Sequence, residues 1–172
     1  MAFLADEKKR ISHNYHKLIM SVLLFFYLMV IQTDITMYKE KWGRGLNEQP
    51  ISIINPILIG GIILLTIYLN THLFWIKEQG KMIFILRKYD MIPLSKKEMY
   101  SSKIKIIINN QVIFLVVSIM IYIASLVMNS YFTINIMKNI WELLVMILLS
   151  ISLIIIILIR NLLEDYKTKR KI

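Results

Sequence analysis

The stretch Ile106–Met128, IIINNQVIFLVVSIMIYIASLVM, lies in a run without charge that extends from Lys105 to Lys138. An α-helix needs about 20 apolar residues, within a range of roughly 17–25, to cross the hydrocarbon core of a bilayer. Three more uncharged runs lie between Lys17 and Asp34, between Glu48 and Lys77, and between Glu142 and Arg160. The sequence therefore predicts an all-α polytopic membrane protein with four transmembrane helices, at about 17–33, 51–69, 106–128 and 140–159.

The composition indicates one membrane domain. The chain has 172 residues, 57% of them hydrophobic, with a mean hydropathy of +0.60. Four spans of about 20 residues use nearly half of it, so we expect a single transmembrane domain over residues 1–172 with short loops. The absence of cysteine excludes disulfides and thiolate metal sites. The abundance of Ile, Lys and Asn is typical of a bacterial gene of low GC content, and we expect the bacterial plasma membrane.

The placement of the basic residues predicts the topology. With the N-terminus inside, the cytoplasmic segments hold 17 of the 21 Lys and Arg residues; only Lys39, Lys41, Arg44 and Lys138 lie outside. Lys and Arg are enriched in cytoplasmic loops, so we expect both termini in the cytoplasm. The net charge of +10 then reflects topology and contact with lipid headgroups, and we expect no nucleic-acid partner.

Residues 1–16 mix charged and apolar side chains. Phe3, Leu4, Ile11 and Tyr15 approximate one helical face, which predicts an amphipathic helix in the inner membrane interface before the first span. A frayed basic tail is the alternative.

Polar residues, proline and glycine interrupt the second span. Pro56 removes a backbone donor and is expected to kink or break the helix. Asn55 either bonds a neighbouring helix or lines a polar cavity, and the sequence leaves both open. Gly60 and Gly61 allow close approach of another helix and are a candidate contact with a second membrane chain. Further candidates for helix packing or a pathway are Asn109 and Asn110.

Side chains suited to catalysis or metal binding are sparse. No segment matches the Gly-x4-Gly-Lys-Ser/Thr phosphate-binding pattern. His13 and His16 could share a helix face, but a metal site wants further ligands and interfacial anchoring is the alternative. Glu142 is either an intramembrane functional acid or a group exposed at the outer headgroups. We expect no catalytic residue, metal or cofactor on this chain.

The inner loop 77–105 is the most specific segment. Its first part, 77–87, predicts a short helix with an apolar face and a basic back, which Pro93 ends. Ser95 is placed to cap a new helix, with Glu98 as its capping-box partner. Two short helices would then form a rigid elbow between spans 2 and 3.

This loop resembles the loop between spans 2 and 3 in permease subunits of type-2 ABC exporters. The pattern is an acid, a glycine, a run ending in leucine, then Pro-x-Ser-Lys-Lys-Glu and a lysine that enters the next span. It falls on Glu78, Gly80, Leu86, Pro93, Ser95, Lys97, Glu98 and Lys103. The resemblance covers residues 1–160, including the family's N-terminal elbow helix, but members usually have six spans rather than four.

The resemblance implies a permease subunit of an ATP-driven export complex. A coupling helix in the inner loop would dock on a separate ATP-binding cassette ATPase, which would carry ATP and Mg²⁺, so this chain is expected not to be an enzyme. The expected coupling residues are Glu78, Gly80, Met82, Ile83, Leu86, Arg87, Pro93 and Lys97. The resemblance also implies a second membrane subunit, which is the same chain or a different one. It further implies an amphipathic substrate, such as a peptide or a lipid-like molecule. The alternative is a non-transport accessory, immunity or scaffolding subunit.

Overall fold

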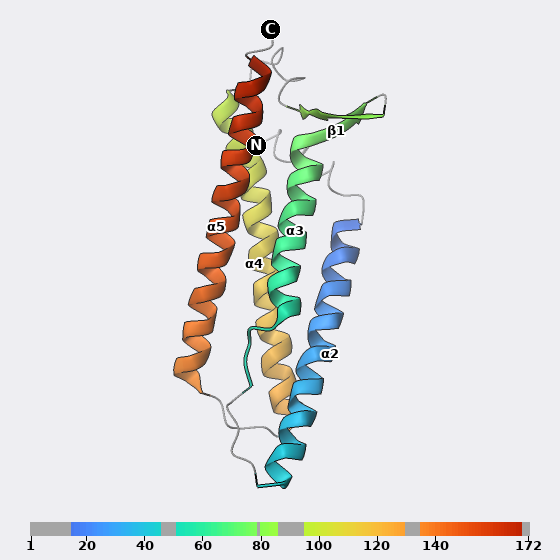
Figure 1. Cartoon of the computed structure of the whole chain (residues 1–172), viewed down its shortest axis with the longest axis vertical. Helices are drawn as coiled ribbons and strands as arrows, with labels where there is room; N and C mark the ends of the chain where they lie inside the picture. The colour runs from blue at the N-terminus through green and yellow to red at the C-terminus, as the bar shows by residue number, and fades with distance from the viewer. Residues whose placement is uncertain (1–14, 46–50, 79, 86–94, 130–134, 170–172) are drawn as a thin grey trace.

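A computed structural model describes residues 15–45, 51–78, 80–85, 95–129 and 135–169. In this part of the chain, four long helices form a bundle with a two-stranded hairpin at one end (Figure 1). The elements in chain order are α2 (Tyr15–Gly43), α3 (Pro56–Phe74), β1 (Trp75–Glu78), β2 (Lys81–Phe84), α4 (Lys96–Met128) and α5 (Ile136–Lys169). All four helices are long and apolar enough to cross a membrane, which confirms the all-α polytopic fold.

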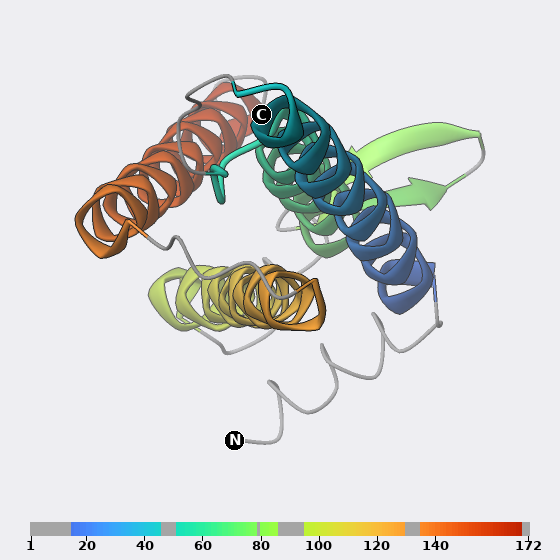
Figure 2. The same cartoon turned by 90° about the horizontal axis from the view of Figure 1, so that it is seen from below.

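The helices alternate in direction, so each end of the bundle collects particular termini. The starts of α2 and α4, the ends of α3 and α5, and the hairpin lie at one end, which we call the hairpin end (Figure 1). Seen along the bundle, α3 and α4 lie between α2 and α5 (Figure 2). The predicted interfacial helix over residues 1–16 lies outside the described residues, except that Tyr15 and His16 begin α2.

All four helices extend beyond the predicted spans, α3 by ending at Phe74 rather than at residue 69. The first runs on to Gly43, the third begins at Lys96 rather than Ile106, and the fourth covers Ile136–Lys169. The predicted cap at Ser95 is confirmed, because its side-chain oxygen accepts the backbone N–H of Glu98 at 3.3 Å. The capped helix is continuous with the third span, since nothing in the sequence after Ser95 interrupts it.

The second span begins later than predicted. Residues 51–55 are not helical, and α3 begins at Pro56, where the missing N–H costs no hydrogen bond. Asn55 has an extended backbone (φ −138°, ψ 166°), and its side-chain oxygen accepts the N–H of Leu58 at 2.8 Å. Pro56 therefore starts the helix rather than kinking it.

The predicted helix over 77–87 is wrong. Trp75–Glu78 and Lys81–Phe84 pair as antiparallel strands, with Trp75 opposite Phe84 and Glu78 opposite Lys81. Gly80 adopts φ +78° at the turn, a conformation that favours glycine. The hairpin wins over the helix because Phe84 is buried against Phe74, with the two rings stacked at 6.1 Å.

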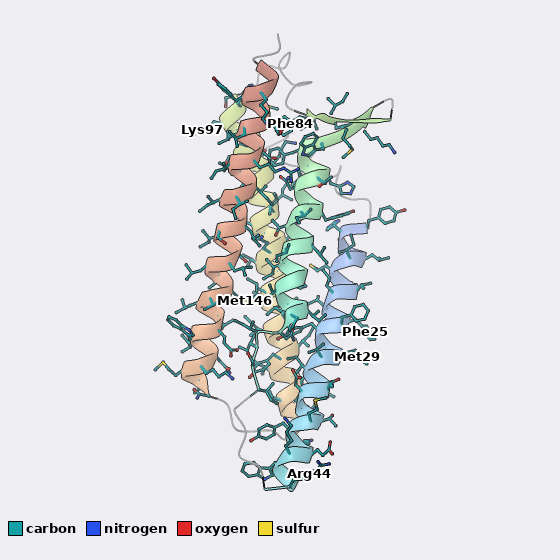
Figure 3. All side chains as sticks on the ribbon, in the orientation of Figure 1. Phe25, Met29, Arg44, Phe84, Lys97 and Met146 are labelled. Atoms are coloured by element: carbon teal, nitrogen blue, oxygen red, sulfur yellow. The ribbon has the colours of Figure 1, made fainter. Side chains whose placement is uncertain are left out.

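The core is unevenly shared among the helices. Most buried apolar side chains come from α2, α3 and α4; α3 alone contributes Leu58, Ile62, Leu65, Leu69, Leu73 and Phe74. By contrast, α5 contributes one, Met146, which points toward the rest of the bundle (Figure 3). Phe25 and Met29 lie on the outer face of α2, each more than half exposed, as expected for a face that contacts lipid (Figure 3).

Candidate functional site

The non-helical segment 51–55 is held by side chains from three helices. Tyr122 of α4 donates its hydroxyl to the carbonyl of Ile51 at 3.0 Å. Tyr27 of α2 donates to the carbonyl of Ile53 at 3.1 Å. Backbone without regular structure is tolerated at membrane depth only where it is buried in protein and its polar groups are paired. These two tyrosines meet that requirement for the carbonyls of Ile51 and Ile53.

Glu142 of α5 binds the same segment from the other side. One carboxylate oxygen, Oε1, accepts the Ser52 hydroxyl at 2.7 Å. The other, Oε2, accepts the backbone N–H of Ile53 at 2.7 Å and, more weakly, that of Ile54 at 3.4 Å. We call this set of contacts the Glu142 clamp. It joins α5 to the chain immediately before α3.

The environment of Glu142 suits a buried carboxylate. The residue is only 8% exposed, and Lys138, one turn earlier, places its Nζ 3.7 Å from Oε1. A buried charge is tolerated when it is paired and hydrogen-bonded, as this one is. The alternative that Glu142 is exposed at the headgroups is therefore wrong.

A second polar cluster lies at the hairpin end. The side chain of Lys103 on α4 is fully buried, and its Nζ donates to the carbonyl of Leu73 at 2.6 Å. The ammonium also lies 5.5 Å from the centre of the Phe74 ring, within reach of a cation–π interaction. Leu73 and Phe74 form the last turn of α3, so Lys103 attaches α4 to the point where the helix becomes β1.

Asn161 attaches α5 to this same end. Its side-chain Nδ2 donates to Oδ1 of Asn70 on α3 at 2.7 Å. The backbone carbonyl of Asn161 accepts a hydrogen bond from the Tyr100 hydroxyl of α4 at 3.2 Å. One turn later, Asp165 pairs with Lys96 at 3.0 Å. We call these contacts the Asn161 clamp. Helix α5 is thus held by polar contacts to the segment before α3 near one end and to α3 and α4 near the other.

The polar residues in the middle of the bundle form hydrogen bonds within this chain. Gln111 donates to the Thr66 hydroxyl at 2.6 Å, which joins α4 to α3. Asn110 donates to the carbonyl of Ile106 in its own helix at 2.9 Å, and Asn109 is exposed. The predicted candidates Asn109 and Asn110 therefore make no hydrogen bond to another helix in the described part of the chain, whereas their neighbour Gln111 does.

The residues predicted in span 2 have local roles. Asn55 caps its own helix through its side-chain oxygen, and its Nδ2 is buried without a hydrogen-bond partner among the described residues. A Cβ added at Gly61 would lie 2.8 Å from Cζ of Phe114, so Gly61 permits the close packing of α3 on α4. A Cβ at Gly60 would meet nothing within 4 Å. The glycine pair is thus divided: Gly61 faces this chain and Gly60 faces open space.

The predicted coupling residues gather at the hairpin end where the structure describes them. Glu78 ends β1, and Gly80 lies at the turn. Met82 is half exposed and Ile83 partly buried on β2, while Lys97 is exposed in the first turn of α4 (Figure 3). Leu86, Arg87 and Pro93 lie outside the described residues.

The histidines offer no metal site in the described part of the chain. No group of three or more His, Cys, Asp or Glu side chains there could hold a metal ion, and His13 lies outside it. His72 packs against Tyr68, with ring centres 4.3 Å apart.

Neither the Glu142 clamp nor the Asn161 clamp was predicted from the sequence. In the Glu142 clamp two of the contacts come from backbone N–H groups, which no side-chain pattern reveals. The Asn161 clamp had a usable signal: Asn70 lies in an uncharged run and Asn161 directly follows one, and polar side chains at such positions commonly bond another helix. Comparisons of the chain with protein-family models, with curated proteins and with solved structures found no match.

Proposed function

We propose that this chain is a membrane permease subunit of an ATP-driven export complex, in which a separate ATP-binding cassette ATPase docks at the hairpin end. The observation that carries the proposal is the attachment of the hairpin: β1 follows α3 with no intervening residue, and Phe84 and Ile85 are buried at 6% and 1% exposure. A force on the hairpin would therefore act directly on α3. The hairpin takes the place that the sequence assigned to a coupling helix.

Charge placement supports docking at this end in the cytoplasm. Most of the basic residues belong to the segments that begin or end there, as the positive-inside rule requires of a cytoplasmic face of a bacterial plasma membrane. Closure of the ATPases would push on the two hairpins of a dimeric membrane assembly and shift the spans between two arrangements. The apolar outer surfaces of the helices favour an amphipathic substrate, such as a peptide or a lipid-like molecule.

The test is purification from the native host, followed by ATPase and transport assays in proteoliposomes. Gly80→Leu places a side chain at φ +78°, a strained conformation, and should distort the hairpin turn. Glu78→Arg changes the charge beside that turn. Both variants should retain expression and lose substrate-stimulated ATP hydrolysis. Ser152→Ala is the matched control, because that hydroxyl is exposed and bonds only its own helix.

Absence of any copurifying ATPase, or full activity of both hairpin variants, would overturn the proposal. The number of membrane chains is a separate measurement. Four spans leave little wall for a substrate path, so the mass of the nanodisc-embedded complex should correspond to at least two membrane chains. A functional particle with one copy and no other membrane subunit would contradict transport by this chain.

A second candidate function is a non-transport accessory, immunity or scaffolding subunit. The observation that favours it is internal pairing: Gln111 bonds Thr66, Asn161 bonds Asn70, and Glu142 bonds the segment before α3. A bundle whose polar groups bond one another suits a single fixed arrangement. This candidate predicts that the purified partner complex has the same ATPase rate with and without the chain.

A further inference from the structure

We propose that α5 is the moving helix of this bundle: it swings away from α3 at the hairpin end while the Glu142 clamp keeps it attached at the opposite end. This inference concerns the bundle alone and holds whichever partner docks. It follows from how unequally the four helices are held together.

The apolar contacts of α5 are mostly partial: Leu143, Leu149, Leu153 and Ile154 pack against the core but are only partly buried. In a bilayer, lipid tails are as apolar as the side chains that they replace, so burying apolar surface between helices gives no hydrophobic driving force. Tight packing and polar contacts decide which helices stay together. Met146 is the single buried apolar side chain that α5 contributes among the described residues, whereas α2 contributes Tyr27, Ile31, Ile35 and Tyr38.

Polar groups therefore carry much of the attachment of α5. The two clamps are about 28 Å apart along the helix, at 1.5 Å per residue. Between them, Ser150 is buried at 7% exposure, yet its hydroxyl has no hydrogen-bond partner among the described residues. The middle of the interface thus adds apolar packing through Leu149, Leu153 and Ile154 but no polar contact through Ser150, so the polar attachment of α5 is concentrated near its two ends.

The two clamps differ in strength. The Glu142 clamp uses an ionised side chain with one oxygen on a hydroxyl and the other on backbone N–H groups, and hydrogen bonds to charged groups are about twice as strong as neutral ones. The centre of the Asn161 clamp is a neutral amide pair, and Asn161 Oδ1 is buried without a partner among the described residues. Its ion pair, in which Lys96 Nζ donates to both carboxylate oxygens of Asp165 at 3.0 and 3.1 Å, is more exposed than Glu142 and is therefore more strongly screened by solvent.

The weaker clamp is also the one that the hairpin can disturb. Asn70 lies in the last turns of α3, next to Leu73, whose carbonyl Lys103 binds, and Phe74, on which Phe84 packs. A displacement of the hairpin would therefore move Asn70 away from Asn161. At the opposite end, Glu142 grips residues that precede α3 and lie far from the hairpin.

The experiment is a pair of spin-label distance measurements in nanodiscs, which the cysteine-free sequence makes simple. One pair, Ile67→Cys with Leu163→Cys, reports on the hairpin end; the other, Ile123→Cys with Leu144→Cys, reports on the opposite end. All four positions are about half exposed, so labels there leave the core intact. Each pair is measured in the otherwise unchanged chain, in Asn161→Leu, in the milder Lys96→Gln, and in the control Ser152→Ala.

We expect Asn161→Leu, and to a smaller extent Lys96→Gln, to lengthen and broaden the Ile67–Leu163 distance while the Ile123–Leu144 distance stays unchanged. Ser152→Ala should change neither distance. Helical content, measured by circular dichroism, should be the same in all variants. Unchanged Ile67–Leu163 distances in both clamp variants would overturn the inference. Equal broadening of the two distances would also overturn it, because α5 would then be loose along its whole length.

Discussion

The ammonium of Lys103 lies 2.6 Å from the carbonyl oxygen of Leu73, in a position where the Lys103 side chain has no exposed surface. This contact joins the first turns of α4 to the last turn of α3, where the chain enters the hairpin. A buried cation at a helix C-terminus also interacts favourably with the helix dipole. Lys103 therefore fixes the base of the hairpin.

The first prediction concerns this contact. Lys103→Met keeps the length of the side chain and removes the charge, which leaves the Leu73 carbonyl without this donor. Loss of a hydrogen bond to a charged group should lower the stability of the hairpin end by about 1.5–3 kcal/mol. Limited trypsin digestion should then cleave at Lys77 and Lys81 faster than in the unchanged chain. Lys105→Met, at an exposed position in the same helix, is the control, and equal cleavage of the two variants would contradict the assigned role.

The second prediction concerns Glu142. Glu142→Leu removes the acceptor of the Ser52 hydroxyl and of the Ile53 N–H, and it leaves that N–H buried and unpaired. We expect a loss of about 1–3 kcal/mol, the usual cost of leaving a buried donor without its partner. Thermal unfolding in detergent measures it. Glu40→Gln, which removes an exposed ion pair with Arg44, should change the unfolding temperature little; a similar shift in both variants would argue against the Glu142 clamp.

The third prediction separates the two adjacent glycines of α3. Gly61→Ala places a Cβ 2.8 Å from a fully buried Phe114 ring, so it should destabilise the bundle by about 1–3 kcal/mol. Gly60→Ala meets nothing and should be neutral or stabilising, because alanine favours the helix by roughly 1 kcal/mol. The unfolding temperatures of the two variants test this. Phe114→Leu in the Gly61→Ala background should recover part of the loss; no recovery would place the cause elsewhere.

The fourth prediction is the topology. Single cysteines at Gly45 and Ser130 should react with an impermeant maleimide in intact cells, whereas cysteines at Gln79 and Thr168 should react only after the membrane is opened. The reason is the concentration of basic residues in the segments at the hairpin end. Detection of the labelled chain by mass shift gives the result, with the unchanged cysteine-free chain as the blank. The reverse labelling pattern would refute the assigned orientation.

The structural features that depend on residues close together in the sequence could be predicted. The four spans follow from runs without charge, and the start of α4 follows from Ser95 and Glu98, which lie three residues apart. Pro56 correctly marked an interruption, but its position at the first turn of α3 depends on Asn55 acting as the cap. The hairpin was not predicted because the apolar residues of 77–87 do not alternate regularly enough to exclude a helix. The contact that favours the hairpin over a helix is the burial of Phe84 on Phe74, which is a tertiary contact.

The candidate site was less predictable than the fold. Several expected coupling residues do gather at the hairpin end, but the contacts that organise the bundle join residues far apart in sequence. Glu142 and Ile53 are 89 residues apart, and Asn161 and Asn70 are 91 residues apart. No local pattern specifies which of the polar groups will meet. The hydrogen bonds of the non-helical segment 51–55 were also unpredictable, because their partners come from three different helices, α2, α4 and α5.

The non-helical segment 51–55 also has a consequence for the insertion of the chain into the membrane. The carbonyls of Ile51 and Ile53 are paired by α4 and α2, but the N–H groups of Ile53 and Ile54 are paired by α5, which is synthesised after the other three helices. Until α5 inserts, these donors have no carboxylate to bind, and hydrocarbon offers them none. We therefore expect the start of α3 to remain near the headgroups until Glu142 has been synthesised. A chain truncated before α5 would be a recognisable substrate for membrane quality-control proteases.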